Sequence, residues 1–447
     1  MPDTERGGDR GATAEDADPF DAFRQAAALP RDVLVLSVSM FAFSLGFQMT
    51  GRYLPQYLLA LGATPVVVGL YGTVGNVIGA VYPYPGGAIS DRIGSRSALT
   101  LFGLLSTLGF LFWLVAPLVG PLTVAGVTVE PWVWIFVGLF LAQAWKSLGL
   151  GATFAIVKQS VPPDQLARGF ASTETFRRTA FLLGPVGAAG LLFVGGGEIL
   201  PGFLAVLAVA AVFGAVATAV QHFRYDASED SVGDDFAGIA QVRRDLRELP
   251  DALRPLLVAD TLVRFANGMV YVFFIVVVTE VLQVDVTLFG VYLSPEVFFG
   301  VLLAVEMVVA LLSMYPVARL AERTGLKPVV AIGFVVYAVF PALLVFAPAD
   351  PLVVAGLFAF SGLRFAGLPA HKALIVGPAE RDAGGRVTGA YYLLRNAVVI
   401  PSAALGGVLW EAVSPELAFS VASVVGLLGT GYFLVAGSDF DAYRDDG

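Results

Sequence analysis

Long apolar stretches separated by short polar connections make up most of the 447-residue chain. Twelve of them reach or approach the roughly 20 residues that a helix needs to cross a bilayer. They start near Val33, Val66, Ala98, Trp132, Gly169, Ile199, Leu256, Val297, Pro328, Leu352, Gly385 and Pro415. Lipid-exposed backbone must satisfy its own hydrogen bonds, and these stretches are too long and too uniformly apolar for barrel strands. The pattern predicts an all-α membrane protein with twelve transmembrane helices.

The pattern is duplicated. The charged connection from Gly87 to Arg96 returns 231 residues later as Ala318 to Lys327, and Gly69 then falls on Gly300. Further matches at an offset of 216 pair Gly151, Pro162, Gly169, Pro185 and Gly190 with Gly367, Pro378, Gly385, Pro401 and Gly406. The difference between the offsets indicates a longer connection around residues 117–130. Two pseudo-symmetric six-helix bundles are therefore predicted.

Polar segments set the expected domain boundaries. We expect a disordered acidic cytoplasmic tail at 1–29, bundles at 30–222 and 255–437, a cytoplasmic linker at 223–254 and a second tail at 438–447. The linker either lies as a short amphipathic helix on the membrane surface or is a solvated spacer.

The placement of basic residues predicts the orientation. Twenty of the 27 Lys and Arg residues fall in the tails and connections on one side, and only Arg52 falls in a connection on the other. Cytoplasmic loops of membrane proteins carry an excess of Lys and Arg, so both termini are expected in the cytoplasm of a multi-pass plasma-membrane protein.

Composition narrows the chemistry. With 57% apolar and 14% charged residues, the chain has too little polar surface for a soluble globule. The net charge of -9 and the strong preference for Arg over Lys resemble proteins of salt-loving archaea. There is no Cys, and His222 and His371 are the only histidines, so no disulfide, metal or cofactor site is expected. A hydrolase is excluded by the lack of a Gly-x-Ser-x-Gly or His-Glu-x-x-His run, and an ATP-driven pump by the lack of a phosphate-binding loop.

The duplicated connection carries a family resemblance. Its first copy reads Gly-x-x-x-Asp-Arg-x-Gly-x-Arg and its second copy is a weaker echo. The motif residues are Gly87, Asp91, Arg92, Gly94 and Arg96 in the first copy, and Glu322, Arg323, Gly325 and Lys327 in the second. With twelve spans, this pattern resembles the major facilitator superfamily over residues 30–437. The resemblance implies the fold of that family and a secondary transporter, here expected as a monomer in the bilayer that moves a small molecule and binds no nucleic acid.

The connection motif has a physical role in this interpretation. Asp91 would place a carboxylate at the N-terminus of helix 11, which Gly384 opens, and so close the cytoplasmic side in one state. Arg92 and Arg96 would then reach acidic groups or lipid phosphates, while glycines permit close approach and turns. The alternative is that these arginines only anchor the topology.

Helix 5 carries a second motif, Gly184-Pro185-Val-Gly187. It resembles the Gly-Pro-rich element of proton-coupled antiporters, although Ala188 and Ala189 hold two of the glycine positions. The alternative is that its glycines let helix 5 pack closely on a neighbouring helix.

Ionisable residues within the spans are the candidate site, because a charge at mid-bilayer costs at least ~2.5 kcal/mol unless it faces a bundle interior or cavity. The basic ones are Lys146, Arg177, Arg178, Arg264, Arg364 and Arg395, and the acidic ones are Glu174, Asp260 and Glu306. Asp260 with Arg264, and Glu174 with Arg178, have the i, i+4 spacing of local ion pairs.

Glu306 has no such partner on its own helix. It is either a proton carrier, because a buried carboxyl without a partner favours its neutral form, or the partner of Lys146, Arg364 or another helix. Setting the two local pairs aside leaves an excess of cations, which predicts an anionic substrate held by Lys146 and Arg364. The alternative to an anionic substrate is that some of the arginines within the spans extend their charged ends to the lipid headgroups.

We therefore expect a secondary active transporter that works by alternating access, coupled to H+, with efflux favoured over uptake. An uptake permease for an organic anion is the alternative, and a non-transporting membrane sensor a distant one.

Overall fold

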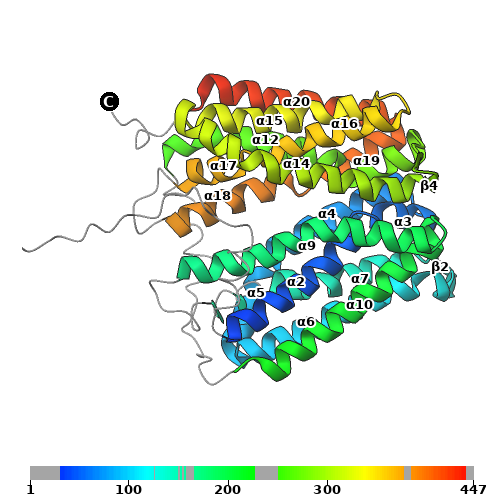
Figure 1. The fold of residues 1–447 in the computed structure, drawn as a ribbon. Helices are drawn as coiled ribbons and strands as arrows, with labels where there is room; N and C mark the ends of the chain where they lie inside the picture. The colour runs from blue at the N-terminus through cyan, green and yellow to red at the C-terminus, as the bar shows by residue number, and fades with distance from the viewer. Residues whose placement is uncertain are drawn as a thin grey trace, which may run out of the picture.

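The computed structural model describes residues 31–124, 126–149, 152–153, 156–157, 166–226, 250–376 and 384–438. Two bundles of helices lie side by side (Figure 1). The expected disordered tails, most of the expected linker and the Pro162 to Arg168 connection lie outside the described residues or their side chains.

The first bundle contains α2 (Arg31–Gly51), α3 (Leu54–Ala60), α4 (Pro65–Val81), α5 (Pro83–Ile93), α6 (Ser95–Val119), α7 (Val133–Gln143), η1 (Ala144–Leu148), α9 (Leu166–Val194) and α10 (Ile199–Arg224). The second bundle begins with η3 (Asp251–Leu253), α12 (Arg254–Val270), η4 (Tyr271–Phe273), α13 (Phe274–Val276), η5 (Val277–Val281), α14 (Pro295–Thr324) and α15 (Leu326–Val345). It continues with α16 (Pro351–Gly362), η6 (Leu363–Phe365), α17 (Leu368–Val376), α18 (Gly384–Val399), α19 (Ser402–Ala412) and α20 (Pro415–Ala436).

The helices begin where the apolar pattern predicts. Each of the predicted starting points lies within three residues of a helix start. Within the described residues, ten helices are long and apolar enough to cross a membrane. Two shorter apolar helices, Pro65–Val81 and Val133–Leu148, occupy the remaining two predicted positions. A membrane protein is confirmed, and the count of twelve spans remains a prediction for these two.

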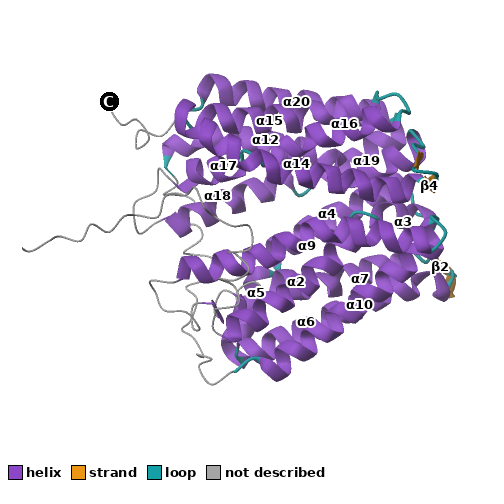
Figure 2. Ribbon diagram, in the orientation of Figure 1, coloured by secondary structure: helices purple, strands orange, loops and turns teal. Residues whose placement is uncertain are grey.

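Two small hairpins depart from the all-α prediction (Figure 2). Strands β1 (Leu122–Val124) and β2 (Val127–Val129) pair antiparallel in the predicted long connection, and β3 (Val286–Leu288) pairs with β4 (Val291–Leu293) before α14. The β-branched residues Val and Thr favour these strands, and Gly126 and Gly290 supply the positive φ that tight turns require. Such short segments carry little signal beside the long apolar spans, so the sequence pattern missed them.

Equivalent glycines of the duplication pack at equivalent interfaces between the bundles. A Cβ on Gly69 in α4 would collide with the backbone of Ala403 in α19. A Cβ on Gly300 in α14 would lie 2.6 Å from the Ala189 Cβ in α9. The pseudo-symmetry read from the sequence is thus expressed in how the two bundles meet.

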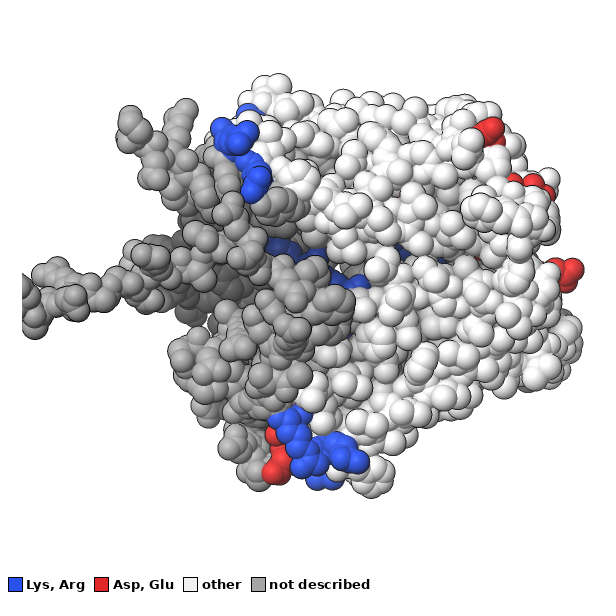
Figure 3. Space-filling view, in the orientation of Figure 1, with Lys and Arg blue, Asp and Glu red and all other residues white. Residues whose placement is uncertain are grey.

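Basic residues at helix ends gather at one end of the molecule, together with a few acids such as Asp32 and Asp251. The described Lys and Arg at helix ends, such as Arg31, Arg224 and Arg254, lie at one end, here called the basic end. The opposite, acidic end carries Glu130, Glu198, Asp285, Asp350, Glu411 and Glu416 in its connections and helix ends. Figure 3 shows both groups on one face.

Candidate transport site

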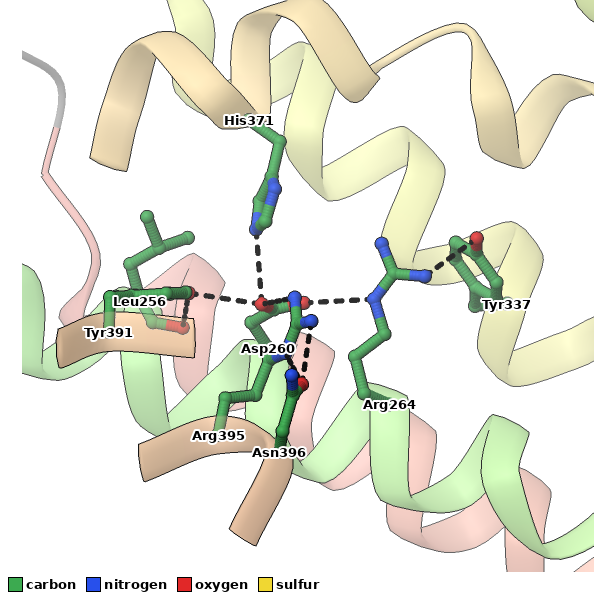
Figure 4. A network of polar contacts seen from close by, with 8 residues as sticks. All are labelled: Leu256, Asp260, Arg264, Tyr337, His371, Tyr391, Arg395 and Asn396. Atoms are coloured by element: carbon green, nitrogen blue, oxygen red, sulfur yellow. Dashed lines mark hydrogen bonds and ion pairs between the residues drawn. The ribbon is translucent and has the colours of Figure 1, made fainter. Parts of the chain in front are cut away.

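Asp260 is the centre of a polar cluster inside the second bundle (Figure 4). Its side chain is wholly buried in α12, and its carboxylate accepts from Arg264 Nε at 3.3 Å and Arg395 Nη1 at 3.1 Å. Tyr391 donates at 3.1 Å, and His371 Nε2 lies 3.3 Å away. Buried carboxylates persist where they are paired and hydrogen-bonded. The predicted Asp260–Arg264 pair is confirmed as one part of this cluster.

The cluster changes the charge balance expected from the sequence. Arg395, expected as a spare cation, is bound to Asp260, so that expectation is wrong. Arg264 also donates to the Tyr337 hydroxyl at 2.8 Å, which adds α15 to the three helices already joined. Contacts between helices bring Arg395 and Asp260 together, and sequence spacing does not show them.

Glu306 on α14 has a partner on another helix. Arg364 Nη2 and Ser361 Oγ each lie 2.6 Å from Glu306 Oε1, and both partners belong to the α16–η6 segment. Glu306 and Arg364 are each 2% exposed. Of the two alternatives for Glu306, the structure therefore contains the ion pair with Arg364. The role of Glu306 as a proton carrier remains a prediction, and a paired carboxylate can still be protonated during transport.

Arg52, expected in an outer connection, lies in the short break between α2 and α3. The chain stays helical beyond it, because α3 follows α2 after a break at residues 52–53. The Arg52 guanidinium lies 4.2 Å from the centre of the Tyr271 ring, and Nη2 is 4.0 Å from Glu306 Oε2. Arg52 thus connects the first bundle to the Glu306 pair in the second.

Lys146 belongs to the first bundle and has an exposed side chain. It lies in η1, a π-helical turn, with Nζ 5.8 Å from the centre of the Phe47 ring. Arg364, its near-equivalent in the repeat, belongs to the 3₁₀ turn η6. π-Helical turns within helices occur often at functional sites. The two central cations therefore share a local irregularity, although only Arg364 is buried.

Helix α9 brings further cations toward Lys146. Arg177 is half-buried, lies close enough to repel the Lys146 charge, and its guanidinium is 5.2 Å from the centre of the Phe181 ring. Arg178 is half-buried too. The side chain of Glu174 lies outside the described residues, so its pairing with Arg178 remains a prediction.

Three of the central cations are more exposed than the carboxylates that they contact. Lys146 is exposed, and the side chains of Arg264, Arg395 and Arg52 are 23%, 16% and 16% exposed. The carboxylates of Asp260 and Glu306 are 0% and 3% exposed. Figure 3 shows Lys and Arg atoms along the line where the two halves meet. A small pocket in the second bundle is also lined by Arg264, Tyr337, Arg364 and His371.

Two glycines of the predicted connection motif make turns, and the gating role of the motif remains a prediction. Gly94 and Gly325 both have φ near +85°, at 80° and 88°, and each makes the turn between two helices. Gly87 has no atom near enough to require a glycine, and the close approach belongs to Gly86, which packs on Leu148. Arg96 Nε donates to the His222 carbonyl at 2.8 Å, a contact with a helix end that the sequence did not predict.

Three further residues of the connection motif have described side chains. Arg92 and Arg323 are exposed, and Lys327 is half-buried. The side chains of Asp91 and Glu322 lie outside the described residues, so their role as latch residues remains a prediction.

The helix 5 glycines pack on the first helix. A Cβ on Gly184 would lie 2.5 Å from the Gln48 Cβ, and one on Gly187 would lie 3.7 Å from the Met49 methyl group. Gly190 has open space beside it. Close helix packing thus accounts for Gly184 directly, whereas it does not account for Gly190.

Two repeated bundles of apolar helices, with buried ionised clusters inside the second bundle, are typical of a membrane transporter. A sequence profile of the Major Facilitator Superfamily matches residues 36–300 and 256–442, and the chain belongs to this family. The chain is 21% identical over 408 residues to an uncharacterized MFS-type transporter of Methanocaldococcus jannaschii, covering 90% of this chain and 93% of that protein. This relative is archaeal, and a saline habitat remains a prediction.

Solved transporter structures share the fold. A POT family transporter in complex with 5-aminolevulinic acid has a TM-score of 0.68 at 14% identity, with 92% of this chain and 98% of that one covered. The nucleoside transporter NupG has a TM-score of 0.70 at 11% identity, with 90% and 98% covered.

Proposed function

We propose that this transporter carries a small organic anion together with H+ across the plasma membrane, by alternating access of the two bundles. The observation that supports an anionic substrate is that the exposed charged side chains of the site are positive. Lys146 is exposed and Arg264 and Arg395 are partly exposed, whereas the carboxylates of Asp260 and Glu306 are buried. In the proposed function these cations line the space between the bundles. A solute in this space meets positive charge from both bundles.

Coupling to H+ follows from the Glu306–Arg364 pair. Protonation of Glu306 cancels the charge that holds Arg364, and the freed guanidinium can then bind the carboxylate of a substrate. Proton binding and anion binding therefore favour one another. Two ligands that help each other bind move in the same direction, which supports symport.

Efflux, the direction favoured by the sequence, rests on the helix 5 motif. Gly184 in that motif is accounted for by packing against Gln48. Uptake of an organic anion, the sequence-based alternative, is therefore our proposal. We also propose that the basic end faces the cytoplasm, as the positive-inside rule predicts, and that the protein acts as a monomer.

Liposome reconstitution tests the proposed function. Internal pH is recorded while a panel of organic anions, and separately of lipophilic cationic drugs, is added outside. Symport predicts that one class of anions acidifies the lumen and that Glu306→Gln abolishes this response. Glu130→Gln, a change in an outer connection, is the matched control and should retain the flux.

Three results would contradict the proposal. Alkalinisation on adding a substrate would indicate antiport. A response to cationic drugs alone would remove the case for an anion, and full proton flux in Glu306→Gln would exclude Glu306 as the carrier.

A further inference from the structure

The N-terminus of α4 is capped by the opposite bundle. Thr64 occupies the N-cap position with extended backbone angles, yet its hydroxyl accepts no hydrogen bond from the first turn. Instead the Val66 N–H donates to Glu411 Oε2 at 3.0 Å, and the Thr64 hydroxyl donates to the same carboxylate. Glu411 belongs to α19, so a carboxylate of the second bundle caps a helix of the first.

This contact lies where the two bundles close on each other. Three residues along α4, Gly69 packs on Ala403, and further in the Thr73 hydroxyl accepts from the Ala404 N–H at 3.0 Å. Beside them, Gln56 Nε2 donates to Glu296 Oε1 at 3.0 Å, again between bundles. Among the described residues, hydrogen bonds between the bundles thus gather toward the acidic end, and the structure is closed on that side.

The partial positive charge at a helix N-terminus makes the contact between Glu411 and α4 stabilising. The first N–H groups of a helix have no partner within it and carry a partial positive charge, so a carboxylate placed there is stabilising. Glu411 supplies it only while the bundles touch. When they separate, Thr64 already has the extended conformation from which a threonine hydroxyl can accept from the first turn. The helix can thus exchange one cap for another.

We propose that Glu411 is the outer latch of the transport cycle, which caps α4 while the acidic side is closed and leaves it when that side opens. Its arrangement is the reciprocal of the inner latch predicted from the sequence, where Asp91 at the end of helix 2 would meet the N-terminus of helix 11. Here a residue at the end of helix 11 meets the N-terminus of helix 2. The proposal requires alternating access and is independent of the substrate, the proton and Glu306.

Cysteine accessibility tests the latch without any substrate. The chain has no Cys, so Thr73→Cys gives a single reporter inside the closed interface. Intact cells are treated from outside with a membrane-impermeant maleimide. Losing an N-cap contact should raise the rate of labelling about five-fold in Glu411→Ala. Glu411→Gln, which keeps an acceptor without the charge, should give a smaller increase.

Glu416→Ala is the matched control. Glu416 is exposed at the same end, and its hydrogen bonds are to Ser414 and its own backbone at the start of α20. It should leave the labelling rate unchanged. The proposal is overturned if folded Glu411→Ala, checked by size-exclusion chromatography, labels within two-fold of the parent, or if Glu416→Ala labels equally fast. Failure of anion transport in liposomes would leave this result unaffected, so the two proposals fail separately.

Discussion

Arg364 and Glu306 face each other across two helices of one bundle, with Nη2 and Oε1 2.6 Å apart and both side chains almost completely buried. Ser361 supplies a second hydrogen bond to the same carboxylate oxygen. Aromatic rings enclose the guanidinium, the nearest being Phe365 with its centre 4.8 Å from Cζ. Both charges are shielded from solvent, so we expect the stability of the protein to depend on this pair.

Arg364→Ala should strongly destabilise the protein. It leaves Glu306 charged and buried without its main partner, which typically costs about 3–5 kcal/mol in the free energy of unfolding. The double variant Arg364→Met with Glu306→Gln removes both charges and should recover most of the loss. Thermal unfolding in detergent, followed by tryptophan fluorescence, measures both effects. Arg323→Ala, at an exposed position on α14, is the control, and equal stability of Arg364→Ala and the parent would refute the argument.

Lys146→Gln should weaken substrate binding without lowering the amount of protein. Its side chain is exposed and its ammonium group has the Phe47 ring 5.8 Å away, so we expect folding to depend little on it. Losing one charge-assisted contact to an anion should raise the apparent substrate constant about ten-fold. The measurement is the concentration dependence of the proton flux in liposomes.

Lys372→Gln is the control for this variant. Lys372 is exposed on α17 toward the basic end and should leave the constant unchanged. A fall in maximal rate at constant apparent affinity in Lys146→Gln would place Lys146 outside the substrate site.

Asp260→Asn should act on stability rather than on coupling. The change leaves Arg264 and Arg395, which are 23% and 16% exposed, without the buried carboxylate that they share. We expect a loss of about 3–5 kcal/mol in unfolding free energy, with the ratio of protons to substrate retained in the protein that folds. Asp285→Asn, whose carboxylate binds only the exposed Tyr292 hydroxyl among the contacts described, should be neutral. Loss of coupling at normal stability would instead make Asp260 a proton carrier.

The fold was largely predictable because membrane solvation acts on long segments. A span of about 20 apolar residues has few alternatives in lipid, so the helix starts could be read directly. Glycines and prolines that match at fixed offsets indicated the duplication, and Gly69 and Gly300 lie at equivalent interfaces in the structure. The hairpins were missed because three-residue strands carry almost no periodic signal.

The sequence predicted which residues belong to the site, but not which of them contact one another. Charges within apolar spans identified Asp260, Glu306 and Arg364, because such charges need a reason to be buried. Their partners depend on how helices meet. His371 lies 111 positions from Asp260 in the chain, and no local spacing connects them. The one signal for His371 in the sequence was its place in an apolar stretch. The small number of histidines served only to exclude a metal site.

Gly69→Ala should hinder closure of the acidic side. The added methyl group would meet the backbone of Ala403, which cannot move as a flexible side chain can, so α4 and α19 must separate. The closed state would be disfavoured while the open state gains a better helix former than glycine. Labelling of the Thr73→Cys reporter should therefore increase. Gly79→Ala on the same helix has open space at its Cβ position and should leave labelling unchanged. Equal labelling of the two variants would mean that contact at Gly69 does not limit closure.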